Sequence, residues 1–596
     1  PETITTRYVY DKANRLVQTI DPYGNTITIE YNAIGKKAAE IDKLGRRTEY
    51  EYDARGNLIR VIYPDGTDER YTYDAENRKL TFTDRAGRTT SYTYDKLGRL
   101  IQTTFPDGTF TQTEYDAAGR VVRVIDERGN PTRYTYDAAG RRTSVIDALG
   151  NTTTFRYDKN GNMIRMTDAN GNDIQYEYDA NNRRIRTIFP DGTSISTAHD
   201  ALGRKTSETD QAGNTVQFEY DALGRLVKVT DALGHVTSYA YDEVGNMISQ
   251  TDANGHTTKF EYDKLGRRIK RTLPLGMSET TTYDAAGNII SQTDFNGYTI
   301  TYEYDVNNRL IKKNFPDGTS EIYTYTPTGH RKTVTDSRGV TSYEYDSRDR
   351  LVRRTDPDGK RISYTYDASG NRISVTIPSG TTYYTFDALN RLETVTDPNG
   401  GVTTYTYDAV GNRKSVTYPN GVVAEYTYDS LNRLTNLVNR KASGEIISSY
   451  VYTLGPAGNR IRVVENTGRT VDYTYDKNYR LTSESINDPV SGLRVINYTY
   501  DGVGNRLTKT DNGITTTYTY DANDRLLTEN GTTYTYTYTY DDNGNTLSKV
   551  SATKVGIYSY DFQNRLVRAN ITDASGSSVV EYVYDVDGIR VQKTVD

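Results

Sequence analysis

The chain has 596 residues, with 55 Tyr, 11 Phe, no Cys and no Trp, and its 79 acidic and 73 basic residues give a formal net charge of -6. The lack of Cys excludes disulfide bonds, thiolate metal sites and cysteine nucleophiles. The near balance of charge gives no basic surface for nucleic acid. The mean hydropathy of -0.76 favours disorder, but we discount it because tyrosine lowers this index while still packing a large ring.

The sequence shows no segment for targeting or for crossing a membrane. No apolar run approaches the roughly 18 residues of a membrane span. The first residues, Pro1 to Tyr10, are already repeat sequence and lack the pattern of a signal peptide. We therefore expect the chain to be part of a longer protein.

The main feature of the sequence is a repeat that contains the tetrad Tyr-x-Tyr-Asp. From Asp11 to Asp305 the last residue of this tetrad recurs at a constant spacing of about 21 residues, and the chain holds about 28 such units. The spacing becomes irregular near Thr453 and regular again from Asp521. In the irregular part we take Thr453 as the last residue of one tetrad. The chain is therefore one array of repeats.

Each unit has the pattern of a β-hairpin. In Tyr92–Ile101, apolar and polar residues alternate on both sides of a turn. This pattern is typical of two strands rather than a helix. The third residue after the tetrad is nearly always Gly or Asn, which tolerate a positive φ best, so we expect a left-handed residue there. The tetrad Asp caps this loop by accepting backbone N–H bonds. A second turn, such as Asp21–Gly24, ends the unit. The exceptions to Gly or Asn include Asp349, Asp524, Pro456 and Tyr479.

The two faces of the hairpins differ in composition. Tyr92 and Tyr94 share one face, whereas Ser91 and Thr93 lie on the other. The sixth residue after the tetrad is usually aliphatic, as at Ile101, and we place it on the tyrosine face. Cross-strand pairs of Tyr with Ile or Val each stabilise a sheet by roughly 0.2 to 1 kcal/mol. We expect the tyrosine face to lie in the buried wall or to line the interior, with the polar face outside.

The repeats predict an all-β fold, in which tandem units of about 20–25 residues form one long antiparallel sheet. Two strands per unit, about 4.8 Å apart, give a sheet on the order of 270 Å long. Because sheets of more than about ten strands curl or split, we expect it to wind into a hollow spiral shell. About two turns would give a diameter of roughly 40 to 45 Å, with space for a small domain. A straight solenoid with a dry core is the competing arrangement.

The repeat resembles that of a known family. The unit Gly-x-x-x-x-(Tyr or Phe)-x-Tyr-Asp-x-x-Gly-Arg, present at Gly87 to Arg99 and at Gly213 to Arg225, is similar to the YD repeat. That repeat occurs in rearrangement hotspot (Rhs) proteins, wall-associated polymorphic toxins, the B and C components of insecticidal toxin complexes, and teneurins. The resemblance covers essentially the whole chain. It implies a spiralling β-sheet shell which, in the bacterial toxins, encloses a C-terminal effector that is released by self-cleavage.

The chain departs from the self-processing members of this family. Those members carry a segment of the type Asp-Pro-x-Gly-Leu after the repeats. Here only Asp488–Leu493 is weakly similar to that segment. The sequence ends inside a repeat at Asp596. We therefore carry over no catalytic residue. We expect that these residues form no enzyme and that any toxin or self-cleavage activity lies outside them.

The four histidines are interpreted as turn or surface residues. His199 takes the place of the second tetrad Tyr, and His235, His256 and His330 each follow a turn Gly. No Cys and no local His cluster accompany them, which argues against a ligand or base role. We therefore predict no catalytic residue, no metal site and no cofactor.

Other recurring polar residues are also interpreted as structural. Asp-rich loops such as Asp158–Asn162 and Asp168–Asp173 miss the spacing of calcium loops, so we assign them to turn capping. Arg99, Arg120 and Arg141 follow the turn Gly, and we expect them to stack on Tyr or to pair with a turn Asp.

These observations predict a non-enzymatic shell. We divide it into a regular array over residues 1–429, irregular repeats with longer loops over 430–510, and further repeats over 511–596, all in one continuous shell domain. The resemblance implies a secreted or cell-surface protein that houses or presents its own C-terminal toxin or effector as cargo. The alternative is an extracellular adhesion or carbohydrate-binding scaffold, in which tyrosine rings stack on sugars. We expect no nucleic-acid partner.

Overall fold

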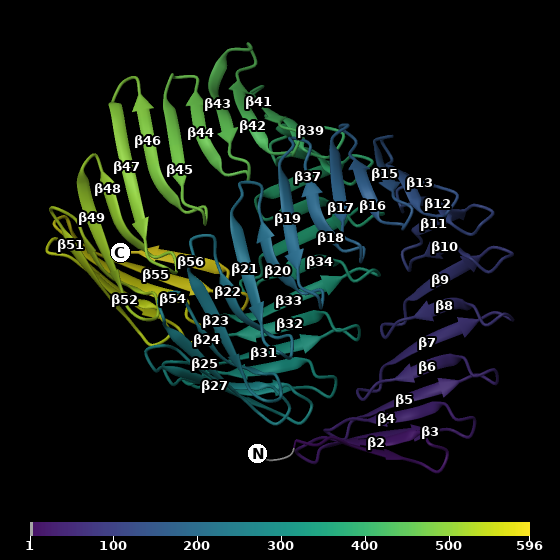
Figure 1. Cartoon of the computed structure of the whole chain (residues 1–596). Helices are drawn as coiled ribbons and strands as arrows, with labels where there is room; N and C mark the ends of the chain where they lie inside the picture. The colour runs from purple at the N-terminus through teal and green to yellow at the C-terminus, as the bar shows by residue number, and fades with distance from the viewer. Residues whose placement is uncertain (1–3) are drawn as a thin grey trace.

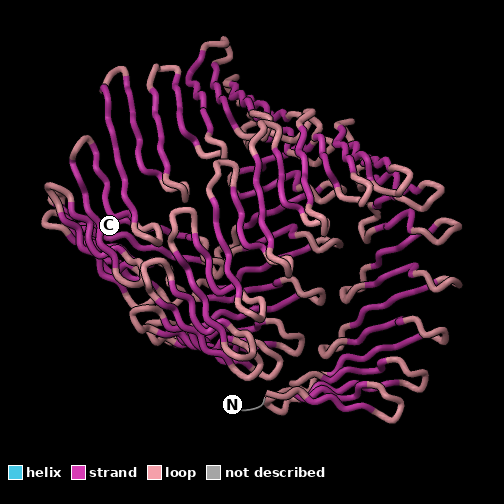
Figure 2. The backbone as a smooth tube through the Cα atoms, in the orientation of Figure 1, coloured by secondary structure: helices cyan, strands magenta, loops and turns pink. Residues whose placement is uncertain are grey.

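A computed structural model describes residues 4–596, and these residues form 56 β-strands and no helix. Consecutive strands pair antiparallel from β1 (Arg7–Tyr10) to β56 (Arg590–Val595), so they make one sheet in simple meander order. The sheet curves continuously and winds into a spiral with two open ends (Figure 1). The strands cross the width of the wall, and turns line both of its edges (Figure 2). The all-β prediction is confirmed. No helix of the described part meets the length and apolarity needed to cross a membrane.

The strands of the regular array are mostly five or six residues long. Their bounds are β2 (Leu16–Ile20), β3 (Thr26–Tyr31), β4 (Lys37–Ile41), β5 (Arg47–Tyr52), β6 (Leu58–Ile62), β7 (Asp68–Tyr73), β8 (Lys79–Thr83), β9 (Thr89–Tyr94), β10 (Leu100–Thr104), β11 (Phe110–Tyr115), β12 (Val121–Ile125), β13 (Pro131–Tyr136), β14 (Arg142–Ile146), β15 (Thr152–Tyr157), β16 (Met163–Thr167), β17 (Asp173–Tyr178), β18 (Arg184–Ile188), β19 (Ser194–His199), β20 (Lys205–Thr209), β21 (Thr215–Tyr220), β22 (Leu226–Thr230), β23 (Val236–Tyr241), β24 (Met247–Thr251), β25 (Thr257–Tyr262), β26 (Arg268–Thr272), β27 (Ser278–Tyr283), β28 (Ile289–Thr293), β29 (Thr299–Tyr304), β30 (Leu310–Asn314), β31 (Ser320–Tyr325), β32 (Arg331–Asp336), β33 (Gly339–Tyr345), β34 (Leu351–Thr355), β35 (Arg361–Tyr366), β36 (Arg372–Ile377), β37 (Gly380–Phe386), β38 (Leu392–Thr396), β39 (Val402–Tyr407), β40 (Arg413–Thr417) and β41 (Val423–Tyr428).

The strands that follow include the longest of the sheet. Their bounds are β42 (Leu434–Arg440), β43 (Ile446–Leu454), β44 (Arg460–Glu465), β45 (Thr470–Tyr475), β46 (Leu481–Asp488), β47 (Gly492–Tyr500), β48 (Arg506–Asp511), β49 (Ile514–Tyr520), β50 (Leu526–Asn530), β51 (Thr535–Tyr540), β52 (Thr546–Val550), β53 (Lys554–Tyr560), β54 (Leu566–Asp573) and β55 (Gly576–Tyr584).

The extra residues of the irregular stretch extend strands. The sequence predicted longer loops over residues 430–510, but β43 and β47 each reach 9 residues and are joined to their neighbours by short turns. The hairpins in this region stand taller than the others (Figure 1). The loop prediction is therefore wrong, because both strands of a hairpin gained residues together and could continue their hydrogen-bond ladder.

One tetrad in this stretch also differs from the sequence alignment. Leu454 lies at the bulge position that the second tetrad Tyr holds elsewhere, so the turn opens at Gly455 and not at Thr453. The N–H of Gly458 donates to the carbonyl of Gly455 at 2.9 Å, and Gly458 has the left-handed φ of 92°. The alignment on Thr453 was therefore wrong by two residues, and Pro456 lies inside the loop rather than at its left-handed position.

The other left-handed turn residues agree with the sequence. Gly98 has a φ of 80° and Asn14 a φ of 59°. The unusual residues at this position adopt the same conformation, with φ values of 60° at Asp349, 62° at Asp524 and 62° at Tyr479. The hairpin loop therefore imposes its backbone even on a residue that rarely adopts it.

The best-buried side chains lie opposite the first tetrad tyrosine. Val334, the eighth residue after its tetrad, is 1% exposed and pairs with Tyr323 on one side and Thr341 on the other. The sixth residue, which we expected on this face, instead falls at the β-bulge that follows each turn. Ile164 and Ile290 at this position are 38% and 40% exposed. That detail of the prediction is wrong because the bulge shifts the alternation of the strand by one residue.

The spiral brings residues of successive windings together. Hydrogen bonds across windings join residues that lie between 221 and 269 positions apart in the chain. The shortest separation is that of Arg348 and Glu127, and the longest is that of Tyr479 and Asp210. One winding therefore takes about 12 repeats, or roughly 24 strands. At about 4.8 Å per strand this corresponds to a diameter of roughly 37 Å, close to the value expected for about two turns.

Candidate functional site

An arginine links each repeat to the next one, and these links build the wall. Arg267 donates from Nε to Oδ2 of the turn residue Asp263 at 2.7 Å. Its Nη1 donates to the carbonyl of Asp284, which opens the next turn, at 3.0 Å. The guanidinium also lies 4.6 Å from the ring centroid of Tyr283. Arg99, Arg120 and Arg141 repeat all three contacts, which confirms both roles that the sequence predicted for them.

The second tetrad tyrosine makes a further link between neighbouring hairpins. The hydroxyl of Tyr94 donates to the carbonyl of Lys79 at 2.8 Å, and Arg78 lies 5.3 Å from the centroid of its ring. Burial raises the pKa of Tyr94 above its ordinary value. The same hydroxyl bond recurs along the array, for example from Tyr115 to Leu100 and from Tyr136 to Val121. These rings and hydroxyls are therefore engaged within the wall.

The turn aspartates cap their loops as predicted. Oδ1 of Asp158 accepts the backbone N–H groups of Asn160 and Asn162, both at 2.9 Å. Asp168 does the same with Asn170 and Asn172. In these two loops the carboxylates are thus oriented by their own backbone, and the loops that suggested calcium have the geometry of capped turns.

The edges of successive windings meet along a line that we call the seam. One edge carries the second turns of the earlier winding, and the other carries the tetrad turns of the later winding. Arg128 illustrates the contact, since its guanidinium donates to the carbonyls of Phe386 and Asp387 at 2.8 and 2.9 Å. Other pairs joined across the seam are Arg46 with Asp305, Arg88 with Asp346 and Asp349, Asn170 with Asp408, Asn214 with Tyr479, Asn254 with Asp501, Asn296 with Asp541, and Gln563 with Glu321.

The carboxyls of Asp501 and Asp349 at the seam have pKa values below their ordinary value. Burial alone would raise the pKa of Asp501, but hydrogen bonds from Asn254 across the seam and from Asn505 in its own loop lower it below the ordinary value. Burial likewise opposes ionisation of Asp349, and the Arg88 guanidinium across the seam outweighs it. Crevices also open along this line, and one is lined by Phe315 and Glu321 on one winding and by Asp561 and Asp585 on the other. The seam therefore combines charged side chains of two windings with crevices between them.

The four histidines occupy different surroundings. His199 ends β19 as the counterpart of the second tetrad Tyr, and its Nδ1 is buried. His235 lies 3.0 Å through Nδ1 from Oδ2 of Asp231. The ring of His330 packs on that of Tyr345, with the centroids 5.1 Å apart. His235 and His330 lie in turns, as predicted, whereas the buried Nδ1 places His199 within the wall rather than at the surface.

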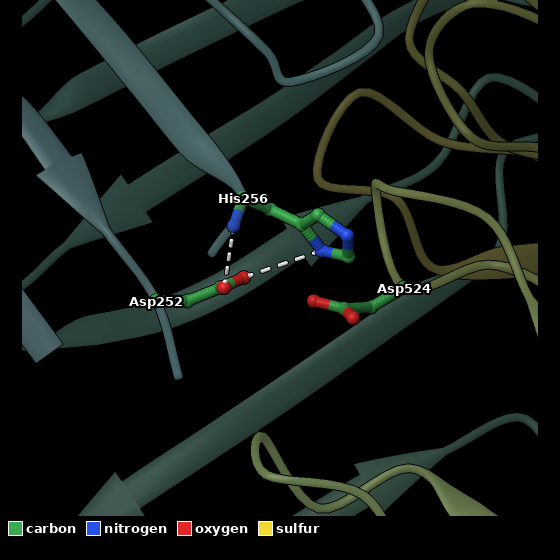
Figure 3. Close-up of side chains that lie close together, drawn as sticks. All are labelled: Asp252, His256 and Asp524. Carbon is green, nitrogen blue, oxygen red and sulfur yellow. Dashed lines mark hydrogen bonds and ion pairs between the residues drawn. The ribbon is translucent and has the colours of Figure 1, made fainter. Parts of the chain in front are cut away.

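His256 is part of a cluster that spans the seam. Ligand atoms of Asp252, His256 and Asp524 all lie within 4.8 Å of one another. Figure 3 shows the imidazole between the two carboxylates, with Asp252 on its own loop and Asp524 on the loop of the next winding. The sequence does not reveal this grouping, because Asp524 is remote in the chain and only the length of one winding relates the two loops.

The chain matches two family models. The model described as Teneurin YD-shell matches residues 111–273. The model described as RHS Repeat matches residues 31–68, 73–109, 283–320, 304–341, 325–361, 345–382, 386–423 and 407–444. A comparison with curated proteins gave no match.

Solved structures share the fold of the chain. The crystal structure of TcdB2-TccC3-Cdc42 matches with a TM-score of 0.65 at 16% identity, covering 99% of this chain and 40% of that one. The crystal structure of TcdB2-TccC3-TEV matches with a TM-score of 0.62 at 14% identity, covering 99% and 42%. The chain therefore spans about two fifths of the length of these proteins.

Proposed function

Because the chain belongs to the YD-repeat (Rhs) family, we propose that it is the encapsulating wall of a secreted or surface-exposed protein and that it houses or presents a toxin or effector polypeptide. In this proposal the wall is not an enzyme, and the cargo is a further part of the same protein. The fold that the chain shares with TcdB2-TccC3-Cdc42 and TcdB2-TccC3-TEV supports the shell architecture on which this proposal rests.

Two observations together carry this proposal. Hydrogen bonds join successive windings along the seam, and few side chains of the wall are buried. Among residues 4–596 only 11 apolar residues are buried, and Val334 is the one large side chain below 2% exposure. A solenoid with a dry core would bury one face of nearly every strand against another layer. Here the tyrosine face packs mainly within its own sheet, so the space inside the winding is not filled by the wall itself.

The contacts of the tyrosines favour this function over carbohydrate binding. A sugar stacks on a free aromatic face, but the ring of Tyr283 already lies against Arg267 and its hydroxyl donates to the carbonyl of Arg268 at 2.8 Å. The same arrangement occupies one face of many tetrad rings. The tetrad tyrosines therefore serve as parts of the wall.

Electron microscopy of the purified chain tests the shell. We expect a rounded hollow particle with a wall one sheet thick, and small-angle scattering should give the distance distribution of a hollow body. A solid rod would overturn the proposal.

Protease protection tests the housing of cargo. A small protease-sensitive reporter is fused after Asp596, and the same reporter mixed with the chain in trans serves as the control. We expect the fused reporter to survive a protease concentration that digests the control. Equal digestion of the two would contradict encapsulation even if the particle is hollow.

A further inference from the structure

We propose that Asp252, His256 and Asp524 form a binding site for a divalent transition metal of the zinc class, which joins two windings across the seam. Two of the ligands come from the loop between β24 and β25, and the third comes from the loop between β49 and β50. The proposal stands apart from encapsulation, because its tests measure metal binding and not cargo.

The orientation of the first two side chains leaves ligand atoms free. Oδ1 of Asp252 accepts the backbone N–H groups of Asn254 and His256, both at 2.9 Å. This fixes the carboxylate and turns Oδ2 toward Nδ1 of His256, at 3.6 Å. Within the described residues, Nδ1 of His256 is buried and has no hydrogen-bond partner. A buried ring nitrogen without a partner is costly unless a ligand satisfies it.

The preceding repeat shows how a similar loop is satisfied without a metal. His235 occupies the same position as His256, but its Nδ1 lies at 3.0 Å from Oδ2 of Asp231. Asn478 from the next winding donates its amide to the same Oδ2 at 2.5 Å. There the seam supplies a donor to the aspartate. At Asp252 the neighbouring winding presents a second carboxylate instead.

Asp524 is an unusual residue at its position. It occupies the left-handed turn position, with a φ of 62°, where Gly or Asn is the rule along the array. Asp349 is a comparable substitution, and there Arg88 faces the carboxylate across the seam at 2.6 Å. Asp524 faces Asp252 and His256, so two negative charges meet without an arginine between them. A bound cation would neutralise this pair.

The donor set suits zinc better than calcium or magnesium. An imidazole nitrogen with two carboxylates is a typical set for Zn²⁺, whereas Ca²⁺ and Mg²⁺ prefer oxygen ligands alone. Zinc bonds of about 2.0–2.2 Å place ligand atoms roughly 3.0–3.5 Å apart. The ligand atoms here lie within 4.8 Å of one another, so binding needs the most distant pair to approach by up to about 1.5 Å, which a rotation of the exposed Asp524 side chain can supply. Asn505 donates to Oδ1 of Asp524 at 2.8 Å and would orient this ligand. Water would complete the coordination.

Metal titration of the whole chain tests the site. After treatment with a chelator, the chain is titrated with Zn²⁺ by calorimetry and with Co²⁺ by visible absorption. We expect one equivalent of tight binding, the bands of four- or five-coordinate Co²⁺, and a higher melting temperature with Zn²⁺. His256→Ala and Asp524→Asn should each weaken binding at least tenfold, because each removes one of three protein ligands.

The variants are chosen so that misfolding does not confuse the result. Asn holds the position of Asp524 in several other repeats, as at Asn14 and Asn308 with φ values of 59° and 62°, so Asp524→Asn keeps the turn. His235→Ala is the matched control and should bind metal as the unaltered chain does. Absence of saturable binding, binding unchanged in His256→Ala, or a loss in His235→Ala equal to that in His256→Ala would each overturn the proposal.

Discussion

The carboxylate of Asp349 lies 2.6 Å from Nη2 of Arg88, although 261 positions separate the two residues in the chain. The same guanidinium donates from Nη1 to the carbonyl of Asp346 at 3.0 Å. Contacts of this kind hold one winding on another, since the backbone ladder runs only between consecutive strands.

Replacing Arg88 by Ala should loosen the seam while leaving the hairpins intact. Asp349 and the carbonyl of Asp346 would lose a charged donor, and the seam around them would open more often. Hydrogen exchange should become at least several-fold faster at the amides of the loop from Asp346 to Arg350. Amides inside β34 serve as the internal reference, and equally faster exchange there would contradict a local seam effect.

Replacing Arg267 by Lys should weaken the link between two repeats. Lysine cannot donate to Asp263 and to the carbonyl of Asp284 with one planar group. We expect a loss of about 1–2 kcal/mol in the free energy of local opening, measured by native-state hydrogen exchange of β27. Arg353→Lys at a half-exposed pair with Glu344 is the control and should change less than about 0.5 kcal/mol. Similar losses for the two variants would show that Arg267 is an ordinary surface residue.

Replacing Val334 by Ala tests which position of the return strand forms the core. Val334 is 1% exposed between Tyr323 and Thr341, so the smaller side chain should cost about 2 kcal/mol of stability. Ile164→Ala removes a larger side chain at the bulge, where it is 38% exposed, and should cost less. Urea unfolding followed by circular dichroism compares the loss of stability in the two variants. A larger loss for Ile164→Ala would show that the sixth residue, and not the eighth, forms the core.

Acidification should remove the stabilising contribution of Asp21. Burial alone would raise the pKa of this carboxyl, but hydrogen bonds from Lys43 and Asn25 and from backbone N–H groups lower it to about 2. Because the folded pKa is below the unfolded value of about 3.8, the contribution is complete above pH 4 and is lost as the pH falls toward 2. The shift corresponds to about 2 kcal/mol. Asp21→Asn should therefore be less stable than the unaltered chain at pH 6, with a difference that shrinks by pH 2.5 in urea titrations.

The repeat sequence predicts most of the wall because its determinants are local. The left-handed residue, the capping Asp and the bridging Arg lie within one or two units, so the period alone places them. The bulge escaped prediction because it changes the alternation without changing the length of the unit, and it moved the core from Ile164-type positions to Val334-type positions.

The seam could not be predicted to the residue from the sequence. Its partners depend on how many repeats complete one winding, which is set by the accumulated twist and curvature of the sheet. The pairing of Asp252 and His256 with Asp524 is an example, since nothing within either repeat identifies the other. The shift from Thr453 to Gly455 was missed because that unit lacks the tetrad Asp on which the alignment depends.

The distance along the chain between seam partners has a consequence for the evolution of the array. Duplication or loss of one hairpin between Arg128 and Asp387 would move a different turn opposite Arg128, while every hairpin would still pair with its neighbours. Backbone carbonyls such as that of Asp387 recur in every turn, so most of the seam would form again after such a change. Side-chain pairs such as Arg88 with Asp349 would be separated. Each such side-chain pair therefore disfavours the gain or loss of a single hairpin between its members, because that change would remove the contact.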